Sequence, residues 1–586
     1  MCGIFGYVGY KDNAADSILE GLKLLEYRGY DSWGVAVKSG KEIRVEKYTG
    51  KIGNKKLSLP KSTIGIGHTR WATHGGVTIA NAHPHLDCTK KIAVLHNGIV
   101  ENFQEIKEEL IKKGHTFLSE TDTEVIPHLV EEYSKTTDFH TAARKAFNRL
   151  SGLNAIVLVN VASEEIITAK NGSPLVIGIG DKELFVASDV TGIIKHTRKI
   201  IFLEDNQMAI LSGTVTVLSL PDGDKVTPQI HTINWKFETA DKGKFDHFMI
   251  KEIFEQPTII RNIAKNYDSS ITSLSKEIAN AKGTFFIGAG TAFHACLAGS
   301  YFFSKIAKHH INTTVASEFN YLEDFLNKHS LIIALSQSGE TIDVIEPLNR
   351  ARQKKSTIVG VVNALGSTIY RMADYKLLLH AGPEKAVAST KAYTAKLAVL
   401  LLLAFAMNGK VAQAKKSILT AADEMERLLH EKQVNAIKKL AEKLHKVEHI
   451  YTIGRGMSYA TALEAALKIK EVSYIHTEGL AGGELKHGTI ALISKGTPCI
   501  VFAPLDTTYD AMISNAMEIK ARNGYVIGVS PKPSEAFDYW IQTADTGYAS
   551  TLTQILPMQL LAYFLALKTQ TDPDKPRNLA KSVTVK

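Results

Sequence analysis

The rhythm of hydrophobic and polar positions changes about halfway along the chain. Up to about residue 220, the apolar residues come in short runs that glycine and asparagine interrupt, among them IFGYVGY, KIAVLHNGIV and NAIVLVNVA. Two segments between these runs, 17–25 and 101–113, have helical spacing instead. Short apolar runs separated by turn residues are typical of strands. Residues 2–220 are therefore predicted to form a mixed α+β domain with layered sheets.

A different pattern follows after a short transition. The stretch LPDGDK around Pro221 indicates a hairpin or a linker, and FDHFMIKEIFEQP predicts a helix, so we expect residues 221–274 to form a linker and helical connection. From about Lys282 onward, strands alternate with helices: TFFIGAG and LIIALSQSGE have the pattern of strands that end in turns, and TAFHACLAGSYFFSKIAK lies between them as a helix. This alternation predicts an α/β doubly wound parallel sheet.

The α/β pattern occurs twice. The stretch FFIGAGTAFHA resembles YTIGRGMSYAT, with Gly288 in the first matching Gly454 in the second. We therefore expect an internal duplication, with copies at 275–425 and 435–570, the helical stretch Val411–Leu444 across their junction, and a tail at 571–586. The same offset aligns the polar loop SQSGET of the first copy with FAPLDTT of the second. A ligand site in this loop is predicted in the first copy only.

Composition indicates the class of protein and its cellular location but says little about its function. The chain has 586 residues, of which 45% are hydrophobic and 22% charged, as in ordinary soluble proteins. The most apolar run, Leu397–Met407, is shorter than the roughly 20 residues that a membrane span needs and predicts a buried helix. The chain does not open with a basic segment followed by an apolar one, as a signal peptide does. A cytoplasmic protein without a membrane partner is expected.

The net charge of +9 permits anionic partners, including phosphates. Lysine and arginine are spread along the chain, and no basic stretch is interleaved with aromatic residues. A solvated basic surface is therefore the preferred interpretation, and no nucleic-acid partner is expected.

The four cysteines, Cys2, Cys88, Cys296 and Cys499, are far apart and form no CxxC pair. Their spacing argues against a disulfide framework and against a zinc ribbon, and no metal site is expected. Cys2 directly follows the initiator methionine. Once Met1 is removed, the thiol of Cys2 lies beside its own α-amine, whose pKa of about 8 allows it to accept the thiol proton. The alternative is a buried structural cysteine.

Three motifs could complete a site around such a nucleophile. In HNGIVEN, the Asn97 amide and the Gly98 backbone N–H could form an oxyanion hole, although Asn-Gly is also a common turn. In HTRWATHG, Arg70 could bind a carboxylate, and in SETDTE, Asp122 could pair with an ammonium group. Together the last two suit an amino-acid zwitterion. A surface salt bridge is the alternative for both.

The second half of the chain contains a candidate phosphate site. The loop SQSGET places hydroxyl groups and free backbone N–H groups at a strand-to-helix turn, where a phosphate could bind without a lysine. The loop residues are Ser336, Gln337, Ser338 and Thr341. Simple capping of the following helix is the alternative.

Proton-transfer groups are also present in the second half. In LEAALKIKEVSY, Lys468 and Glu471 share one face of a helix, although Glu464 and Lys468 also have the spacing of a surface ion pair. In GELKHG, His487 lies between glycines and could transfer a proton near neutral pH, or be an ordinary loop histidine.

The motifs of the first half, together with MCGIFGYVG, LEYRGYDSWGVAV and NAHPH, resemble the class II glutamine amidotransferases of N-terminal-nucleophile type. The resemblance implies that Cys2 is the nucleophile and that Asn97 and Gly98 are oxyanion donors. The residues that it implies around bound glutamine are Arg70, Trp71 (as a gating residue), Thr73, His74, Gly75 and Asp122. Trp33 departs from the family pattern, because a small residue is more usual after YDS.

The motifs of the second half resemble the paired sugar-isomerase (SIS) domains of the glutamine–fructose-6-phosphate aminotransferase family. They are ALSQSGET, AVASTKAYT, ALKIKEVSYIHTEG, GGELKHG and the ending PRNLAKSVTVK. The sugar-phosphate-binding residues implied are Thr291, Ser336, Gln337, Ser338, Thr341, Val387, Ser389 and Ala580. The catalytic residues implied are Lys581 as a Schiff-base lysine, Glu471 and Lys468 in proton transfer, and His487 in ring opening, the last in a neighbouring subunit's site. Two positions depart from the family: Ala292 replaces a serine and Ala386 a glycine.

The resemblance covers nearly the whole chain. It implies a glutaminase domain followed by two SIS domains, with ammonia passing through an internal channel to convert fructose 6-phosphate into glucosamine 6-phosphate, the first step of amino-sugar synthesis. It implies no cofactor, and a homodimer. One alternative is another amidotransferase, such as a phosphoribosyl-amine synthase, but the chain has no acidic pyrophosphate-binding motif. A second is a non-catalytic sugar-phosphate sensor, which the joint presence of Cys2, Glu471, His487 and Lys581 disfavours.

Overall fold

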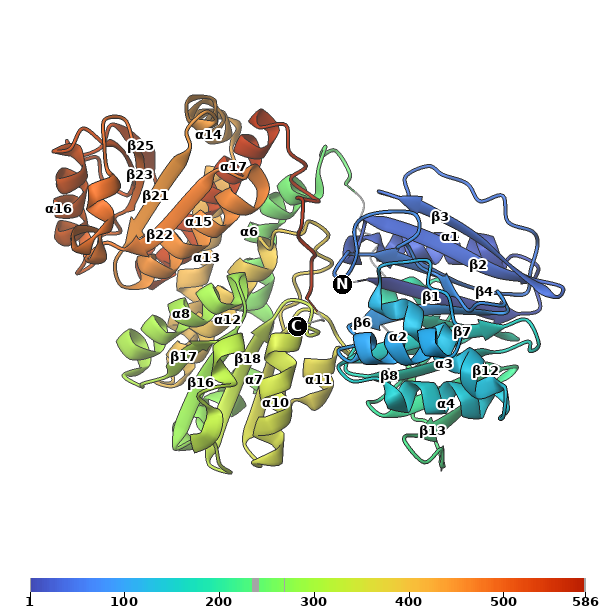
Figure 1. Cartoon of the computed structure of the whole chain (residues 1–586). Helices are drawn as coiled ribbons and strands as arrows, with labels where there is room; N and C mark the ends of the chain where they lie inside the picture. The colour runs from blue at the N-terminus through green and yellow to red at the C-terminus, as the bar shows by residue number, and fades with distance from the viewer. Residues whose placement is uncertain (1, 234–241, 268, 584–586) are drawn as a thin grey trace. The chain divides into compact units, whose positions relative to one another are not determined.

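The chain forms two compact units, which comprise Met1–Glu238 with Ser582–Lys586, and Thr239–Lys581 (Figure 1). The computed structural model describes residues 2–233, 242–267 and 269–583. The break between the units replaces the boundary that the sequence suggested at residue 220, because strands beyond that residue still belong to the sheets of the first unit.

The first unit has four layers, in which two antiparallel sheets pack face to face and helices cover both outer faces (Figure 1). One sheet contains β15 (Ile230–Thr232), β11 (Lys199–Phe202), β9 (Val176–Ile179), β10 (Glu183–Ala187), β1 (Gly3–Gly9), β4 (Ile64–Arg70), β2 (Ser32–Ser39) and β3 (Glu42–Thr49), in this order. The other contains β14 (Lys225–Val226), β13 (Thr214–Ser219), β12 (Gln207–Ser212), β8 (Ile166–Asn171), β7 (Asn154–Asn160), β6 (Ile92–Gly98) and β5 (His85–Leu86). The predicted layered α+β domain is confirmed.

Apolar residues on alternate positions of the strands explain these layers. The inner faces of both sheets share one core, α1 (Ala14–Leu25) and α5 (Val190–Ile193) cover the first sheet, and α2 (Phe103–Lys112), α3 (Val125–Ser134) and α4 (Phe139–Arg149) cover the second. The helices expected at 17–25 and 101–113 correspond to α1 and α2. The stretch around Pro221 joins β13 to β14 as a hairpin.

Strand register brings the predicted glutamine-site residues to one end of these sheets. Because β1 and β4 are antiparallel, with Gly3 opposite Thr69, Cys2 lies beside the end of β4, where Arg70 is located. Gly98 ends β6 in the other sheet. Residues distant in sequence therefore gather where three strands begin or end.

The second unit contains two parallel five-stranded sheets with the same topology, which confirms the predicted duplication. The first has the order β17 (Asn312–Val315), β16 (Gly283–Gly288), β18 (Ser330–Ser336), β19 (Thr357–Val362), β20 (Tyr375–Leu378). The second has the order β22 (His476–Ala481), β21 (His449–Gly454), β23 (Pro498–Phe502), β24 (Tyr525–Ser530), β25 (Tyr539–Gln542). In both, the second strand along the chain lies outside the first. The order therefore reverses between the first and third strands, where ligands of doubly wound sheets bind.

Long helices pack between and around these sheets in one large apolar core. They are α6 (Phe248–Asn266), α7 (Ser269–Asn280), α8 (Thr291–Phe302), α12 (Lys391–Ala406), α13 (Val411–Leu428), α14 (Glu431–Leu444), α15 (Met457–Ser473) and α17 (Ser550–Lys568). The remaining helices of the sheet connections are α9 (Ala316–Phe319), α10 (Ile342–Gln353), α11 (Thr368–Met372) and α16 (Tyr509–Lys520). The expected helix at 397–407 is part of α12 and is buried, and the expected junction helix is the pair α13 and α14.

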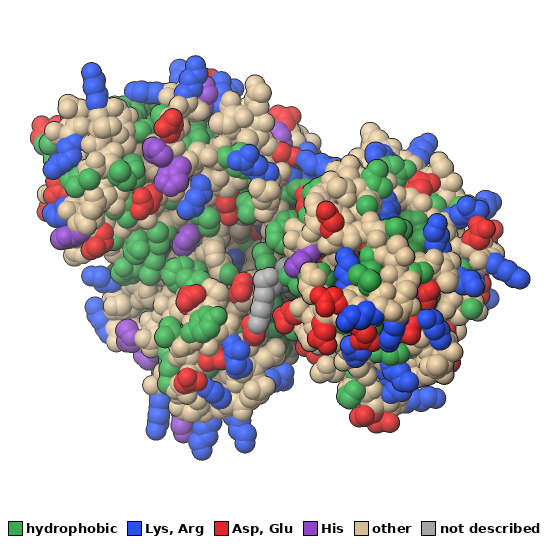
Figure 2. Space-filling model, in the orientation of Figure 1, with side chains coloured by type: hydrophobic (Ala, Val, Ile, Leu, Met, Phe, Trp, Pro, Cys, Tyr) green, Lys and Arg blue, Asp and Glu red, His purple; other side chains and the backbone are tan. Residues whose placement is uncertain are grey.

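One stretch that the sequence analysis did not single out, Gly547–Lys568, is long and apolar enough to cross a membrane. Its most apolar window is 94% buried inside the protein, so it is a core helix of a soluble fold. On the face shown in Figure 2, lysine and arginine side chains are dispersed among acidic and uncharged ones.

Candidate active sites

Cys2 occupies the entrance to β1 with its thiol against the residue that follows β4. The backbone N–H of Trp71 lies 3.3 Å from the Cys2 Sγ atom, and the thiol can donate to the Trp71 carbonyl at 3.6 Å. The carbonyl of Cys2 accepts from the buried Arg28 side chain at 3.4 Å, and Arg28 is in turn paired with Asp189. These contacts fix the backbone of residue 2. Cys2 is only half-buried, whereas the structural-cysteine alternative requires a fully buried side chain.

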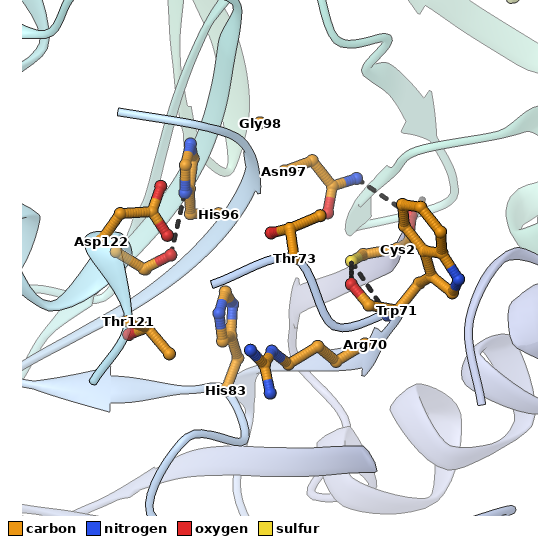
Figure 3. A pocket seen from close by; sticks show the side chains of 11 residues that line it. Cys2, Arg70, Trp71, Thr73, His83, His96, Asn97, Gly98, Thr121 and Asp122 are labelled. Atoms are coloured by element: carbon orange, nitrogen blue, oxygen red, sulfur yellow. Dashed lines mark hydrogen bonds between the residues drawn. The ribbon is translucent and has the colours of Figure 1, made fainter. Parts of the chain in front are cut away.

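The side-chain amide of Asn97 faces Cys2 and is oriented by a histidine. Nε2 of His68 lies 3.2 Å from the carbonyl of His96, which can only accept, so this nitrogen carries the proton. The same N–H donates to Asn97 Oδ1 at 3.0 Å. The amide nitrogen of Asn97 must therefore point the other way, and it donates to the Cys2 carbonyl at 3.0 Å (Figure 3). His68 thus fixes Asn97 in the orientation that an oxyanion donor needs.

Gly98 is the other predicted oxyanion donor, and its backbone requires glycine. Its φ of +135° is a conformation that other residues rarely adopt, and a Cβ atom there would lie 2.2 Å from the Leu153 carbonyl oxygen. Asn97 and Gly98 lie at the end of β6 and pair with β7, so they do not form the hairpin turn that was the alternative.

The Gly98→Ala variant is expected to lose about 100-fold in glutaminase rate, because the clash moves the N–H away from the developing oxyanion. Strain should also cost about 2 kcal/mol of stability. Gly213→Ala is the matched control, since Gly213 has a φ of +66° with no atom within 4 Å of the added Cβ. The rate of glutamate release measures the first effect, and the midpoint of urea unfolding measures the second. Equal losses in the two variants would remove the steric argument.

Buried neutral histidines surround this end of the sheets. His68 stacks on His83 with ring centroids 4.2 Å apart, and both are buried. Burial lowers the pKa of His68 to about 3 and that of His83 well below its ordinary value, and burial also lowers the pKa of His96. The rings therefore act as neutral hydrogen-bonding groups at physiological pH.

Acidification is expected to destabilise the first unit. His68 is protonated near pH 6.5 in the unfolded chain but only near pH 3 in the folded chain. Its contribution to the free energy of unfolding is therefore present above pH 6.5 and is lost as the pH falls toward 3. At pH 5 the loss from this one residue is about 2 kcal/mol relative to pH 7.5. Hydrogen exchange of the β4 and β6 backbone amides, corrected for intrinsic exchange rates, measures this loss of stability. The His68→Gln variant should show a correspondingly smaller pH dependence, and an unchanged one would rule out His68 as the source.

Arg70 and Asp122 lie in the same narrow pocket as Cys2, which Figure 3 shows with side chains from β4, β6 and the turn Asp122–Glu124 converging on it. The pocket is lined by Cys2, Arg70, Trp71, Thr73, His83, His96, Asn97, Gly98, Thr121, Asp122 and Thr123. Both charged residues are buried, which excludes the surface salt bridge that was their alternative.

The guanidinium of Arg70 donates to the carbonyls of His74, Gly75 and Gly76 and so shapes the loop that follows β4. Asp122 accepts from the Val100 N–H at 2.8 Å. The expected glutamine-site residues that do not line the pocket, His74 and Gly75, therefore serve it as backbone partners of Arg70. Trp33, the departure from the family pattern, is a buried residue of β2 and stacks on Tyr48 with centroids 4.5 Å apart, so it belongs to the core.

In the second unit, the predicted phosphate loop lies at the switch point of the first sheet. It connects β18 to α10, next to the turn from β16 into α8 that carries Thr291. Ser336 Oγ accepts from the Gly339 N–H at 3.0 Å and lies 3.1 Å from Thr341 Oγ1. Gly339 needs its glycine, since its φ is +65° and a Cβ would lie 2.0 Å from Ser367 Oγ. Thr341 does not cap α10 with its side chain, so simple capping does not explain it.

Lys468 is buried, and the surface ion-pair interpretation is wrong. Its Nζ lies 2.6 Å from Glu471 Oε2 and 3.4 Å from Glu464 Oε1, and both Lys468 and Glu464 have 0% exposed side chains. Burial acts to lower the pKa of Lys468, but Glu464 and Glu471 outweigh it and the pKa is raised. Lys468 also donates to Thr291 Oγ1 at 3.0 Å. A helix of the second copy thus contacts a predicted sugar-phosphate residue of the first.

Lys581 forms a second buried ion pair, with Glu384. Its Nζ lies 2.6 Å from Glu384 Oε2, and the side chains are 2% and 0% exposed. Ser389 donates to the same carboxylate oxygen at 3.0 Å, and the backbone N–H groups of Thr390 and Ala392 donate to the other. Burial opposes the charge on Glu384, but Lys581 and these donors hold its pKa at about 2. Glu384 was not among the predicted site residues, although it lies two residues before the motif AVASTKAYT.

The tail that carries Lys581 is anchored to the body of the second unit. The Val387 N–H donates to the Asp574 carbonyl at 2.9 Å, and the Asp574 carboxylate accepts from Phe248 and Met249 at the start of α6. Val387, Ser389 and Lys581 are thus brought together, and Ala580 adjoins them in the chain.

Glu252 is a further buried acid that the sequence did not reveal. Burial and the neighbouring Glu384 raise its pKa to about 8, and it accepts from the N–H groups of Lys385 and Ala386. Ala386 is not in the left-handed region, so the glycine usual in the family is not required here. Ala292 is buried at the start of α8.

His487 is exposed in the short helix Glu484–His487 of the second copy. Its side chain makes no hydrogen bond or ion pair with any of the described residues, 2–233, 242–267 and 269–583. The structure therefore does not place His487 with Lys468, Glu471 and Lys581 within one chain.

Comparisons with known proteins agree with both halves. The family model for the SIS domain matches residues 277–406 and 443–563, and that for the glutamine amidotransferase domain matches residues 68–195. Among solved structures, the C-terminal domain of glucosamine-fructose-6-phosphate aminotransferase from Francisella tularensis covers 57% of this chain and 100% of its own, with TM-score 0.54 and 29% identity. The tagatose-6-phosphate ketose/aldose isomerase of Escherichia coli covers 58% of this chain and 98% of its own, with TM-score 0.51 and 18% identity, and supports the fold alone.

Curated relatives match along the whole length. The glutamine–fructose-6-phosphate aminotransferase (isomerizing) of Thermococcus kodakarensis is 44% identical over 602 residues, with 100% of both chains covered. Proteins of the same name from Pyrococcus horikoshii and Thermus thermophilus are 45% and 40% identical, again with 100% of both chains covered. The chain, a glutamine amidotransferase domain followed by two SIS domains, therefore belongs to the family of glutamine–fructose-6-phosphate aminotransferases.

Proposed function

We propose that this enzyme converts fructose 6-phosphate and glutamine into glucosamine 6-phosphate and glutamate, the first step of amino-sugar synthesis. One observation carries the proposal: a single chain combines a cysteine at residue 2, which shares a pocket with the Asn97 amide, with a buried lysine among SIS domains. The first group suits release of ammonia from an amide, and the second suits activation of a sugar carbonyl.

The glutamine half of the reaction depends on Cys2. Its α-amine accepts the thiol proton, directly or through a water, and the thiolate attacks the side-chain amide carbon of glutamine. The Asn97 amide and the Gly98 N–H stabilise the oxyanion. Ammonia leaves with a proton returned by the amine, and water hydrolyses the glutamyl thioester to glutamate. Asp122 and Arg70, with Trp71 and Thr73 at the pocket, suit the charged ends and the body of the amino acid.

The sugar half depends on Lys581. The loop from Ser336 to Thr341, with Thr291, Val387, Ser389 and Ala580, binds the sugar phosphate, and His487 of a neighbouring subunit assists ring opening. The Lys581 ammonium passes a proton to its ion-pair partner Glu384, and the resulting neutral amine condenses with the ketose carbonyl as water leaves; ammonia then displaces the lysine from the imine. Glu471, assisted by Lys468, moves a proton between neighbouring sugar carbons, which gives the aldose.

Transfer of ammonia through an internal channel, rather than through solvent, is part of the proposal, as is a cytoplasmic homodimer. The exposure of His487 in the isolated chain supports the dimer, since that residue acts only if a second chain receives it. No cofactor takes part in this scheme.

The test incubates purified, N-terminally processed protein with glutamine and fructose 6-phosphate and follows glucosamine 6-phosphate and glutamate. Equal amounts of both products are expected. Glutamate without amino sugar would favour another amidotransferase, such as a phosphoribosyl-amine synthase. Absence of both products would favour a sugar-phosphate sensor.

A further inference from the structure

Four potential metal ligands meet in the first unit, outside the glutamine pocket. They are Cys88 in the turn between β5 and β6, His115 beyond the end of α2, and His128 and Glu131 on α3. None of them lines the pocket of Cys2. Both histidines are buried and Glu131 is half-buried, while Cys88 is exposed and gives access from solvent.

Five of the six distances among the four ligand atoms are close to the edges of a tetrahedral zinc site, and the sixth, from Cys88 Sγ to Glu131, is at most 4.8 Å. Nδ1 of His115 lies 3.3 Å from Nδ1 of His128, and Sγ of Cys88 lies 3.6 and 3.4 Å from these two nitrogens. Oε2 of Glu131 lies 3.2 and 3.5 Å from the same nitrogens. Zinc bonds of about 2.0 Å to nitrogen or oxygen and 2.3 Å to sulfur give tetrahedron edges of about 3.3–3.5 Å.

Hydrogen bonding within the cluster accounts for only part of this convergence, such as the Cys88 backbone N–H, which donates to Glu131 Oε2 at 3.1 Å. Nε2 of His115 faces Glu132 Oε2 at 3.1 Å, and a carboxylate only accepts, so this nitrogen carries the proton of the neutral ring. In that tautomer Nδ1 of His115 is a lone pair, which can accept from the Cys88 thiol or from Nδ1 of His128 but not from Oε2 of Glu131 at 3.2 Å; a cation between these two acceptors would satisfy both.

The surroundings of the cluster also suit a metal. Glu132 binds the outer nitrogen of His115 at 3.1 Å, the arrangement in which carboxylates orient zinc-ligating histidines, while Glu124 lies 3.8 Å from the outer nitrogen of His128, beyond hydrogen-bonding distance. The Thr116 N–H donates to Cys88 Sγ at 3.4 Å, as backbone amides do to a thiolate.

We propose that Cys88, His115, His128 and Glu131 bind one zinc ion in a closed, structural site. Four protein ligands leave no position for substrate, so the ion does not take part in catalysis. It ties the β5–β6 turn and the segment after α2 to α3. Because the turn that carries Asp122 leads directly into α3, the ion also steadies one wall of the glutamine pocket. No metal site was predicted from the sequence, since the cysteines have no CxxC spacing.

Metal content of the purified full-length protein is the first measurement. About one zinc per chain is expected by mass spectrometry, and cobalt(II) added to chelator-treated protein should give the visible bands of tetrahedral cobalt with a thiolate-to-metal charge-transfer band. The Cys88→Ser variant should lose that band, while Cys499→Ser, which changes a buried cysteine of the second unit, should keep it. Protein that binds neither ion at micromolar concentration, or a Cys88→Ser variant that keeps the band, would overturn the proposal.

A second variant separates metal binding from misfolding. Glu132→Gln leaves all four ligands in place but weakens the orientation of His115, so zinc affinity should fall about 10–100-fold in competition with a chelator. His140→Gln, at an exposed histidine that pairs with Glu165, is the matched control and should bind zinc normally. Equal zinc affinities for Glu132→Gln and His140→Gln would contradict the geometry of the site.

Discussion

Replacing Lys581 by arginine is expected to lower the rate of glucosamine 6-phosphate synthesis at least about 10³-fold and to leave glutaminase activity unchanged. Arginine keeps the positive charge that Glu384 needs at 2.6 Å, but its guanidinium does not lose a proton in proteins and forms no Schiff base with a ketose. The substitution therefore separates the ion pair from the imine chemistry.

Lys581→Ala alone would not make this distinction. It removes the partner of Glu384, and an uncompensated buried charge costs about 3–5 kcal/mol, which could disturb the fold around Ser389 and Thr390. Loss of synthesis in that variant would then have two explanations. The arginine variant retains the charge, so a loss of synthesis there is attributable to the missing amine.

Lys568→Arg is the matched control, because Lys568 is exposed at the end of α17 and pairs with Glu442. It should retain both activities. Synthesis and glutaminase rates are measured side by side, together with trapping of a protein–sugar imine by borohydride in the unmodified enzyme. Synthesis at a near-normal rate in Lys581→Arg would leave the ion pair as the only role of this residue and refute the Schiff base.

Much of the fold could be predicted from the sequence because its elements have strong local signals. The match between Gly288 and Gly454 correctly predicted two sheets of one topology, since glycine turns at strand ends are part of that architecture. The boundary at residue 220 was placed too early, because a hairpin and a linker have the same turn residues.

The sites were predicted mainly through motifs, and what was missed depends on tertiary contacts. The spacing of Glu464 and Lys468 is the same on an exposed helix and in a buried network, and only the packing of α15 against α8 decides between them. Glu384 could not be identified from its local sequence, because the lysine with which it pairs lies almost 200 residues away in the chain. His68 was quoted within a family motif, yet its role in orienting Asn97 follows from a proton position that only the His96 carbonyl fixes.

The zinc ligands illustrate the same limit. Cys88 comes from a turn, His115 from the end of a helix and the other two from α3, so no short pattern contains more than two of them. The departures at Ala386 and Trp33 show the converse. They are conspicuous beside the family motifs, but Ala386 needs no left-handed backbone, and Trp33 is buried in the core against Tyr48.

Removal of the Cys2 thiol is expected to abolish the use of glutamine while leaving synthesis from free ammonia. The Cys2→Ala variant should lose glutaminase activity about 10⁴-fold or more, because among the described residues no other thiol lines the pocket and a thioester cannot form without one. Synthesis from fructose 6-phosphate and ammonium chloride should stay within about twofold of the unmodified enzyme, since the second unit performs that chemistry.

A chain that retains Met1 provides the sharper form of this test, because every side chain is unchanged. The nitrogen of Cys2 is then part of a peptide bond and cannot accept the thiol proton, so glutaminase activity should be lost as in Cys2→Ala. Such a chain can be prepared with Met1 followed by an added bulky residue that blocks the aminopeptidase, and mass spectrometry confirms its N-terminus. Later proteolytic release of Cys2 as the first residue should restore glutamine use. Glutaminase activity in the blocked chain would show that another base serves the thiol, and His68 and His83, whose low pKa values keep them neutral, would become the candidates.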